Sequence, residues 1–150
     1  MLTRKVEDYL EAILNITDGK GYARTKDIAQ RLDVTPPSVV EMMKKLNDMR
    51  YVNYRKYDGI TPTSEGKVIA AAVRERHDII RAFLKIINVP KDIANKDACT
   101  IEHNLNPKTI KQIKKLVDFV ETAPGCPKWV EHFELFCKTG THECEQRKES

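Results

Sequence analysis

The spacing of apolar residues predicts that most of the chain is helical, with one hairpin in its first half. Apolar side chains recur at helical spacing over residues 4–17, and the glycine-containing residues 18–21 then break the pattern. Two shorter helices are predicted at residues 25–32 and 36–49, and residues 51–63 are typical of a hairpin. Two short helices followed by a hairpin predict a winged helix-turn-helix.

Capping and turn residues support these boundaries. Thr25 and Thr35 are the expected N-caps of the two short helices, and Pro36 stands at a first helical position, where a missing N–H costs nothing. Asp58-Gly59 is a pair typical of hairpin turns and lies between two stretches rich in β-branched and aromatic residues. We therefore expect the tip of the wing at Asp58-Gly59.

The second half of the chain contains only helical patterns. A long helix is predicted from Ser64 to about Ile87, another from about Lys91, and a third after the cap and proline of Asn106-Pro107. A short amphipathic stretch follows at residues 129–136. The predicted fold class is therefore mainly α: an N-terminal winged helix-turn-helix followed by an all-helical part.

Composition narrows the class of protein. The 150 residues are 41% hydrophobic and 32% charged, as in globular proteins, and no apolar run approaches the roughly 20 residues that span a bilayer. The charged N-terminus is unlike a signal peptide, so a cytoplasmic protein with no membrane partner is expected. In that compartment the four cysteines are thiols or metal ligands rather than disulfides.

The segment Cys99-x-x-Glu102-His103 is the main candidate for metal chemistry. Positions i, i+3 and i+4 share one face of a helix, which brings together a thiol, a carboxylate and an imidazole. That donor set suits Fe²⁺, Mn²⁺, Co²⁺ or Zn²⁺ better than Ca²⁺ or Mg²⁺. Three ligands do not fill an octahedral site, and the first helix offers Asp8 and Glu11, again three residues apart.

The winged helix-turn-helix carries the basic charge of the chain. Residues 24–57 contain eight basic and four acidic residues, an excess of +4 that equals the net charge of the whole chain. A helix-turn-helix places the start of its second helix at the base edges of double-stranded DNA. The residues expected at the bases are Thr35, Pro36, Pro37, Ser38 and Glu41, and those expected at phosphates are Lys26, Lys44, Arg55 and Lys56.

Several motifs occur together in the order found in one family. They are Glu7-Asp8-Tyr9-Leu10-Glu11, the segment from Gly21 to Ala29, Thr61-Pro62-Thr63-Ser64-Glu65-Gly66-Lys67, Arg76-His77 and Cys99-x-x-Glu102-His103. Over residues 3–122 the chain resembles the diphtheria-toxin-repressor family of metal-dependent transcription regulators, and most closely its manganese-transport-regulator branch. Nothing resembles the C-terminal SH3-like domain of that family.

The resemblance implies a metal site and a domain division. The implied ligands are Asp8, Glu11, His77, Cys99, Glu102 and His103. In the manganese branch the position of Cys99 is usually a carboxylate, whereas the iron branch has cysteine there but usually methionine at the position of Asp8. The implied domains are residues 1–63 for DNA binding, 64–122 for metal binding and dimerisation, and 123–150 as a cysteine-containing extension.

The C-terminal extension is a second candidate site. Cys126, His132, Cys137, His142 and Cys144 are a potential set of ligands for structural zinc, and Cys126-Pro127 is also compatible with an iron–sulfur ligand. The spacing matches no standard zinc finger. Idle thiols in a polar tail are the alternative.

The sequence therefore predicts a homodimeric, metal-activated transcriptional repressor that binds a palindromic operator and controls iron or manganese homeostasis. Its cofactor is expected to be Fe²⁺ or Mn²⁺, with Co²⁺ or Zn²⁺ able to bind in vitro. One alternative is a redox-responsive DNA-binding regulator that uses an iron–sulfur cluster or zinc in the tail. A metal-dependent hydrolase is less well supported, because no further acid–base residue accompanies the ligand set, so we do not expect an enzyme.

Overall fold

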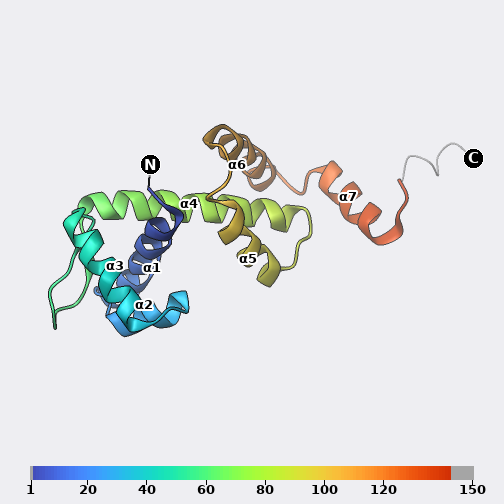
Figure 1. Ribbon diagram of the computed structural model, residues 1–150. Helices are drawn as coiled ribbons and strands as arrows, with labels where there is room; N and C mark the ends of the chain where they lie inside the picture. Colours follow the sequence, from blue (N-terminus) through green and yellow to red (C-terminus); the bar gives the residue numbers. More distant parts are fainter. Residues whose placement is uncertain (1, 143–150) are drawn as a thin grey trace, which may run out of the picture. The chain divides into compact units, whose positions relative to one another are not determined.

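Seven helices and one small sheet make up residues 2–142, the part of the chain that the computed structural model describes (Figure 1). In chain order the elements are α1 (Arg4–Lys20), α2 (Thr25–Leu32), α3 (Pro36–Asp48), β1 (Val52–Asn53), β2 (Thr61–Pro62), α4 (Ser64–Ile86), α5 (Lys91–Ile101), α6 (Pro107–Glu121) and α7 (Lys128–Thr139). This order confirms the mainly α fold class, with a winged helix-turn-helix first.

The chain divides into two units, Met1–Glu75 and Arg76–Ser150, and the division falls inside α4. The domain boundary expected from the sequence lies earlier, at residue 63, between the end of β2 and the start of α4. No helix among the described residues is both long and apolar enough to cross a membrane.

The core of the first unit lies between α1, α2, α3 and the small sheet. Tyr9, Leu10 and Ile13 of α1 pack with Ile28 of α2 and with the apolar face of α3, which consists of Val39, Met42, Met43 and Leu46. α1 is longer than predicted: it continues through residues 18–20 and ends at Gly21, which caps it in the left-handed conformation at φ 85°. The helical spacing of the apolar residues thus identified the buried faces, but not the end of the first helix.

The two short helices begin at caps that differ in part from the predicted ones. Arg24 rather than Thr25 is the N-cap of α2, and its backbone N–H donates to the Asp27 carboxylate at 3.1 Å. Thr35 is the N-cap of α3, as predicted, but its hydroxyl is bonded to the Ser38 hydroxyl at 2.9 Å and not to a backbone N–H. The Asp27 carboxylate thus accepts from the backbone N–H of the N-cap itself, which is the N3 half of a capping box.

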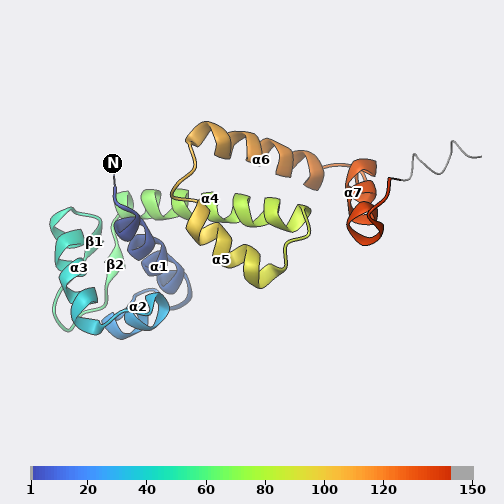
Figure 2. The ribbon, with the colours of Figure 1, turned by 45° about the vertical axis from the view of Figure 1, so that its right-hand side comes forward.

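The wing is shorter than predicted, and its tip is elsewhere. β1 and β2, both labelled in Figure 2, pair antiparallel over two residues each. Beyond them the backbone of Ala23 pairs with that of Ile60. The turn is formed by Lys56 and Tyr57, because the Asp58 N–H donates to the Arg55 carbonyl at 3.1 Å and Tyr57 has φ 74°. The prediction of an Asp58-Gly59 turn is therefore wrong.

Gly59 instead permits a close side-chain contact. A Cβ at this position would lie 2.7 Å from the Cβ of Tyr22, which is too close for two carbon atoms that are not bonded to each other. The packing of the returning strand on Tyr22, rather than a tight turn, accounts for glycine here.

The connection from the wing into α4 is held by Thr63. Its hydroxyl donates to the Arg50 carbonyl at 2.7 Å and accepts from the Gly66 N–H at 3.1 Å. A Cβ on Gly66 would overlap the Tyr51 carbonyl oxygen, so only glycine allows the first turn of α4 to pass this close to the backbone.

The second unit has a smaller core made by three helices. Ile79, Ile80 and Leu84 of α4 pack with Ala94 and Ala98 of α5 and with Ile110 of α6, and Figure 2 shows α5 and α6 flanking this part of α4. Asn106 caps α6, as predicted, by accepting from the Lys108 N–H at 2.9 Å.

Candidate metal centre and cationic groove

Glu102 is the one buried charged residue among the described residues, with 2% of its surface exposed. It stands at the C-cap of α5, directly after Ile101. A buried carboxylate is costly unless cationic or hydrogen-bonding groups surround it. The groups that surround Glu102 therefore show how its buried charge is stabilised.

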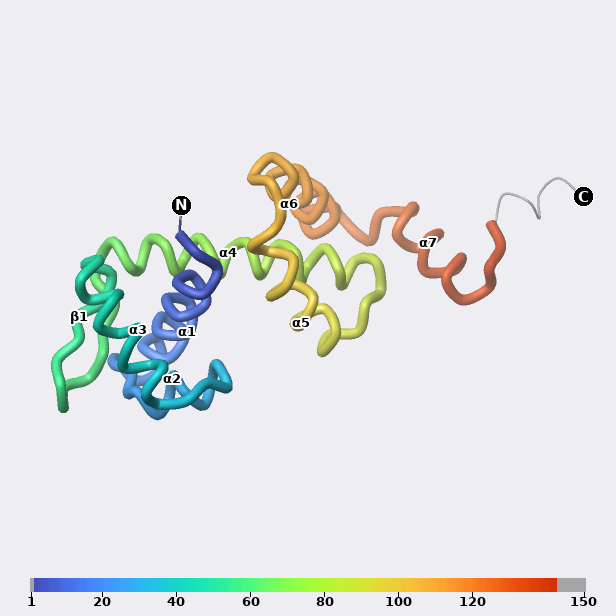
Figure 3. The backbone as a smooth tube through the Cα atoms, viewed as in Figure 1, coloured from blue at the N-terminus to red at the C-terminus, as the bar shows by residue number. Residues whose placement is uncertain are grey.

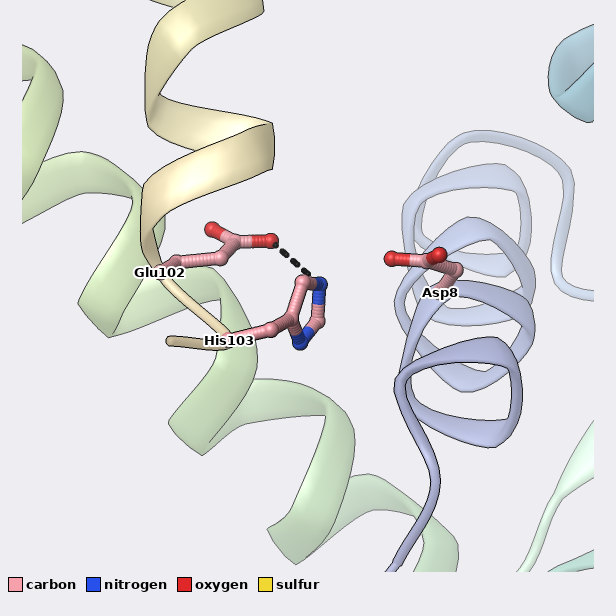
Figure 4. A group of neighbouring side chains, drawn as sticks. All are labelled: Asp8, Glu102 and His103. Atoms are coloured by element: carbon pink, nitrogen blue, oxygen red, sulfur yellow. Dashed lines mark ion pairs between the residues drawn. The ribbon is translucent and has the colours of Figure 1, made fainter. Parts of the chain in front are cut away.

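Two histidines contact the two carboxylate oxygens of Glu102. His77 Nδ1 lies 3.1 Å from Oε2, and His103 Nε2 lies 3.1 Å from Oε1. The second of these pairs is marked in Figure 4. The Cys99 sulfur lies 3.6 Å from His77 Nδ1. A thiol, two imidazoles and a carboxylate thus form one continuous chain of contacts within the second unit.

These contacts change the basicity of His77. The Cys99 sulfur, followed by the Glu102 carboxylate, raises the pKa of His77 from 6.5 to about 10, although partial burial acts in the opposite direction. The site therefore favours a positive charge at this imidazole. A divalent cation satisfies the same electrostatic demand, and it displaces the proton because only neutral imidazole binds a metal.

The local backbone differs from the predicted helical face. α5 ends at Ile101, so Cys99 lies in its last turn, Glu102 caps it, and His103 follows in a turn. Glu102 keeps the helical backbone, because its N–H donates to the Ala98 carbonyl, so the predicted face extends one residue past the end of α5 and only His103 lies beyond it. The turn brings the His103 ring onto the Glu102 carboxylate, and only 4% of the His103 side chain is exposed.

Asp8 and Glu11, the two candidate ligands of the first unit, both lie on α1. Each is half-buried, and they are one turn apart on the helix. Arg4 Nε lies 3.8 Å from the Asp8 carboxylate. Figure 4 also labels Asp8 on α1.

The donors of the second unit fit a divalent transition-metal ion. A thiolate and two imidazoles are borderline-to-soft ligands that Fe²⁺, Co²⁺ and Zn²⁺ accept, and the carboxylate is compatible with these ions and with Mn²⁺. A bound ion would also compensate the buried carboxylate of Glu102. The types of donor atom and the burial of the Glu102 carboxylate therefore both favour a bound divalent metal ion.

A second feature lies wholly within the first unit. Residues of α2, α3 and the wing line an open groove of about 1220 Å³, and five of them are cationic: Arg24, Lys26, Lys44, Arg55 and Lys56. Asp58 is the single acidic residue in this lining. The wing loop beside the groove can be followed in Figure 3 between β1 and the start of α4.

The predicted DNA contacts occupy two places in this unit. All four residues predicted at phosphates, Lys26, Lys44, Arg55 and Lys56, line the groove and are exposed. The residues predicted at bases lie at the start of α3, where Thr35, Pro36, Pro37 and Glu41 are exposed and Ser38 is half-buried. A cationic groove beside an exposed helix start fits a polyanion.

Arg24 was not predicted as a groove residue. Its guanidinium lies 5.5 Å from the centre of the Tyr22 ring and donates to the Tyr22 hydroxyl at 3.4 Å. Arg24 belongs to the basic stretch of residues 24–57, but it precedes the helix-turn-helix in the sequence. The pairing of Ala23 with Ile60 and the packing of Tyr22 against Gly59 bring this segment to the wing.

The predicted tail ligands are not gathered together in the described part of the chain. Cys126 and Cys137 are exposed free thiols. His132 and His142 do meet, with Nε2 of the first 3.3 Å from Nδ1 of the second. Cys144 lies outside the described residues, so the five-residue tail site stays a prediction.

Comparisons with known proteins agree with a DNA-binding first unit and a metal-binding second unit. The family model "Iron dependent repressor, N-terminal DNA binding domain" matches residues 1–60, and "Iron dependent repressor, metal binding and dimerisation domain" matches residues 63–130. The HTH-type transcriptional regulator MntR of Oceanobacillus iheyensis is 42% identical over 119 residues, which are 79% of this chain and 81% of the relative. MntR of Bacillus subtilis is 41% identical over 121 residues, covering 81% and 85% respectively.

A solved structure supports the fold over most of the chain. The structure of the manganese regulator SloR matches with a TM-score of 0.68 at 28% identity, covering 84% of this chain and 58% of the SloR chain. This chain therefore spans a little over half the length of SloR. The first family model matches most of the first unit, and the second matches the second unit up to residue 130. The chain belongs to the iron-dependent repressor family, and it is a metal-dependent, DNA-binding transcriptional repressor of metal homeostasis.

Proposed function

We propose that this repressor binds its operator when Fe²⁺ or Mn²⁺ occupies a regulatory site and releases it when the ion is lost. The observation that carries the proposal is the buried carboxylate of Glu102 held between two imidazoles. The proposed ligands are Asp8, Glu11, His77, Cys99, Glu102 and His103.

The two carboxylates of α1 complete the set in this proposal. The second unit offers one thiol, two imidazoles and one carboxylate, which is fewer than the six ligands that Fe²⁺ or Mn²⁺ takes in octahedral coordination. Asp8 and Glu11 supply hard oxygen donors one turn apart. Because α1 belongs to the DNA-binding unit, an ion held by both sets couples metal occupancy to the DNA-binding surface.

The donor set supports both candidate metals. The thiolate of Cys99 favours Fe²⁺, whereas the three carboxylates keep Mn²⁺ available. The resemblance to the manganese regulator SloR supports Mn²⁺. We therefore name both ions as candidates, with Co²⁺ and Zn²⁺ as ions that bind in vitro.

DNA recognition is assigned to the first unit. The cations of the groove, Arg24 among them, neutralise phosphates, and the start of α3 faces base edges. We further propose that two chains, joined through the dimerisation domain, read a palindromic operator in the cytoplasm. Metal binding then fixes the arrangement that matches the spacing of the half-sites, which is a shift between conformational populations.

The alternative of a redox regulator built on tail cysteines has less support. Cys126 and Cys137 are exposed, and neither belongs to a group of three clustered metal-ligating side chains among the described residues. An iron–sulfur cluster requires several thiolates at one place.

Electrophoretic mobility shift of genomic fragments tests the proposal. The full chain is mixed with fragments in chelator and in each divalent metal separately. Retardation of a specific fragment with Fe²⁺ or Mn²⁺, and its loss in chelator, is the expected result. Equal retardation with and without metal would contradict the proposed function.

A further inference from the structure

We propose a second metal site, separate from the regulatory one, in which His132 and His142 bind Zn²⁺ at the C-terminal end of α7. The proposal begins from the distance between their ring nitrogens, which is 3.3 Å from His132 Nε2 to His142 Nδ1. Neither residue belongs to the ligand set described above, and both follow the region that the family models match.

The separation of the two nitrogens equals that of two ligands on one zinc ion. Zinc binds imidazole nitrogen at about 2.0–2.1 Å in tetrahedral geometry, which places two such nitrogens about 3.3–3.4 Å apart. Without a metal, the same pair can only share one proton in a hydrogen bond. A zinc ion replaces that proton without any change in the distance between the nitrogens.

The local fold holds the pair in place. Gly140 caps α7 with φ 71°, and its N–H donates to the Phe136 carbonyl at 2.7 Å. This left-handed residue reverses the chain, so that His142 returns along the helix it follows. The His142 ring then stacks on Phe136, with centroids 4.7 Å apart and the planes at 29°.

A third side chain, Phe136, supports the histidine pair. His132 and Phe136 are four residues apart, so they share one face of α7. The His142 ring contacts both of these side chains: it stacks on Phe136 and lies edge-on to the His132 ring, with centroids 5.2 Å apart.

Two imidazoles leave two positions of a tetrahedral zinc ion for water or for further side chains. The described thiol on this helix, Cys137, is not clustered with the histidine pair. Cys144 lies outside the described residues, and the proposal does not require it. The proposed site therefore has two protein ligands, and the bound zinc ion would link His142, which follows α7, to His132 within the helix.

Zinc titration of the full chain against a competing chromophoric chelator tests the site. Because the regulatory site also accepts zinc, the titration uses a background carrying Glu102→Gln and His103→Ala. In that background, His132→Ala and His142→Ala should each lower zinc affinity at least about tenfold, since even changes around metal ligands cost that much. Cys137→Ser, on the same helix, is the matched control and should leave the affinity unchanged.

Long-range ¹H–¹⁵N spectra of the imidazoles provide a second measurement on the folded protein. Added zinc should shift Nε2 of His132 and Nδ1 of His142 together. Unchanged zinc affinity in both histidine variants, or the absence of a zinc-dependent shift at these nitrogens, would overturn the site. Mn²⁺-dependent DNA binding by the His132→Ala chain is expected to be normal, so failure of this proposal is distinguishable from failure of the regulatory one.

Discussion

His77 Nδ1 lies 3.1 Å from the Oε2 oxygen of Glu102, although the two residues are 25 positions apart in the sequence. The contact joins α4 to the end of α5 and places an imidazole on a carboxylate that solvent barely reaches. Both groups are metal ligands by type, and the second oxygen of Glu102 contacts a second imidazole, that of His103. Glu102 is therefore the residue on which the regulatory site depends most.

Replacing Glu102 by glutamine should remove metal activation while keeping the fold. The amide has the same shape as the carboxylate but carries no charge, so we expect Mn²⁺ and Fe²⁺ affinity to fall by more than about tenfold. Isothermal titration measures the affinity, and circular dichroism checks the fold. The control is Glu121→Gln on the exposed end of α6. A Glu102→Gln protein that still binds its operator in response to metal would show that Glu102 is not a ligand.

Replacing Cys99 by glutamate should change which metal is preferred. A hard carboxylate takes the place of a soft thiolate, so affinity should shift toward Mn²⁺ and away from Fe²⁺ and Co²⁺. The Co²⁺ complex of the native chain should also show a thiolate-to-metal charge-transfer band in the near ultraviolet. The band should disappear in Cys99→Glu and persist in Cys137→Ser. If it persists in Cys99→Glu, another thiol holds the metal.

Removing one groove cation should weaken DNA binding without changing its sequence preference. Lys44 is exposed and lines the groove, and it was predicted to contact a phosphate. For Lys44→Gln, the slope of log affinity against log salt should become shallower by about one, because one fewer counterion is released. Fluorescence anisotropy at several salt concentrations measures the slope. Lys111→Gln, on an exposed position of α6, is the control and should keep the native slope.

The junction between the wing and α4 should tolerate no side chain at Gly66. An added Cβ would overlap the Tyr51 carbonyl oxygen, so Gly66→Ala should lower the free energy of unfolding by about 2–3 kcal/mol. Gly19→Ala is the matched control, because Gly19 lies in α1 where an added Cβ would meet open space, and it should raise stability by about 0.5–1 kcal/mol. Urea denaturation compares the two variants. Equal stability of the two would mean that α4 does not start as close to Tyr51 as described.

Local patterns predicted the helices well, because each buries one apolar face. The spacing of Tyr9, Leu10 and Ile13 identified α1, and the proline after Thr35 identified the start of α3. The same local reasoning failed at the wing tip. Asp58-Gly59 is a good turn pair by composition, but the glycine is required by Tyr22, which lies far away in the sequence.

In the candidate site, too, local sequence patterns missed contacts between residues that are distant in the sequence. Cys99, Glu102 and His103 were found from their spacing, whereas His77 was assigned only through the family resemblance, because a single histidine in a long helix carries no local signal. Its contact with Glu102 depends on how α4 and α5 pack. Arg24 was missed as a groove residue for a related reason: a backbone pairing with Ile60, not sequence proximity, brings its neighbour Ala23 to the wing.

The central claim is that metal binding and DNA binding are thermodynamically linked, and a closed cycle of affinities tests it most directly. Operator affinity is measured in chelator and at saturating Mn²⁺ or Fe²⁺, and metal affinity is measured for the free chain and for its operator complex. Linkage requires the operator to tighten metal binding by the same factor by which metal tightens operator binding, and this factor should exceed about tenfold. Operator affinity that is the same in chelator and in saturating metal would contradict the account.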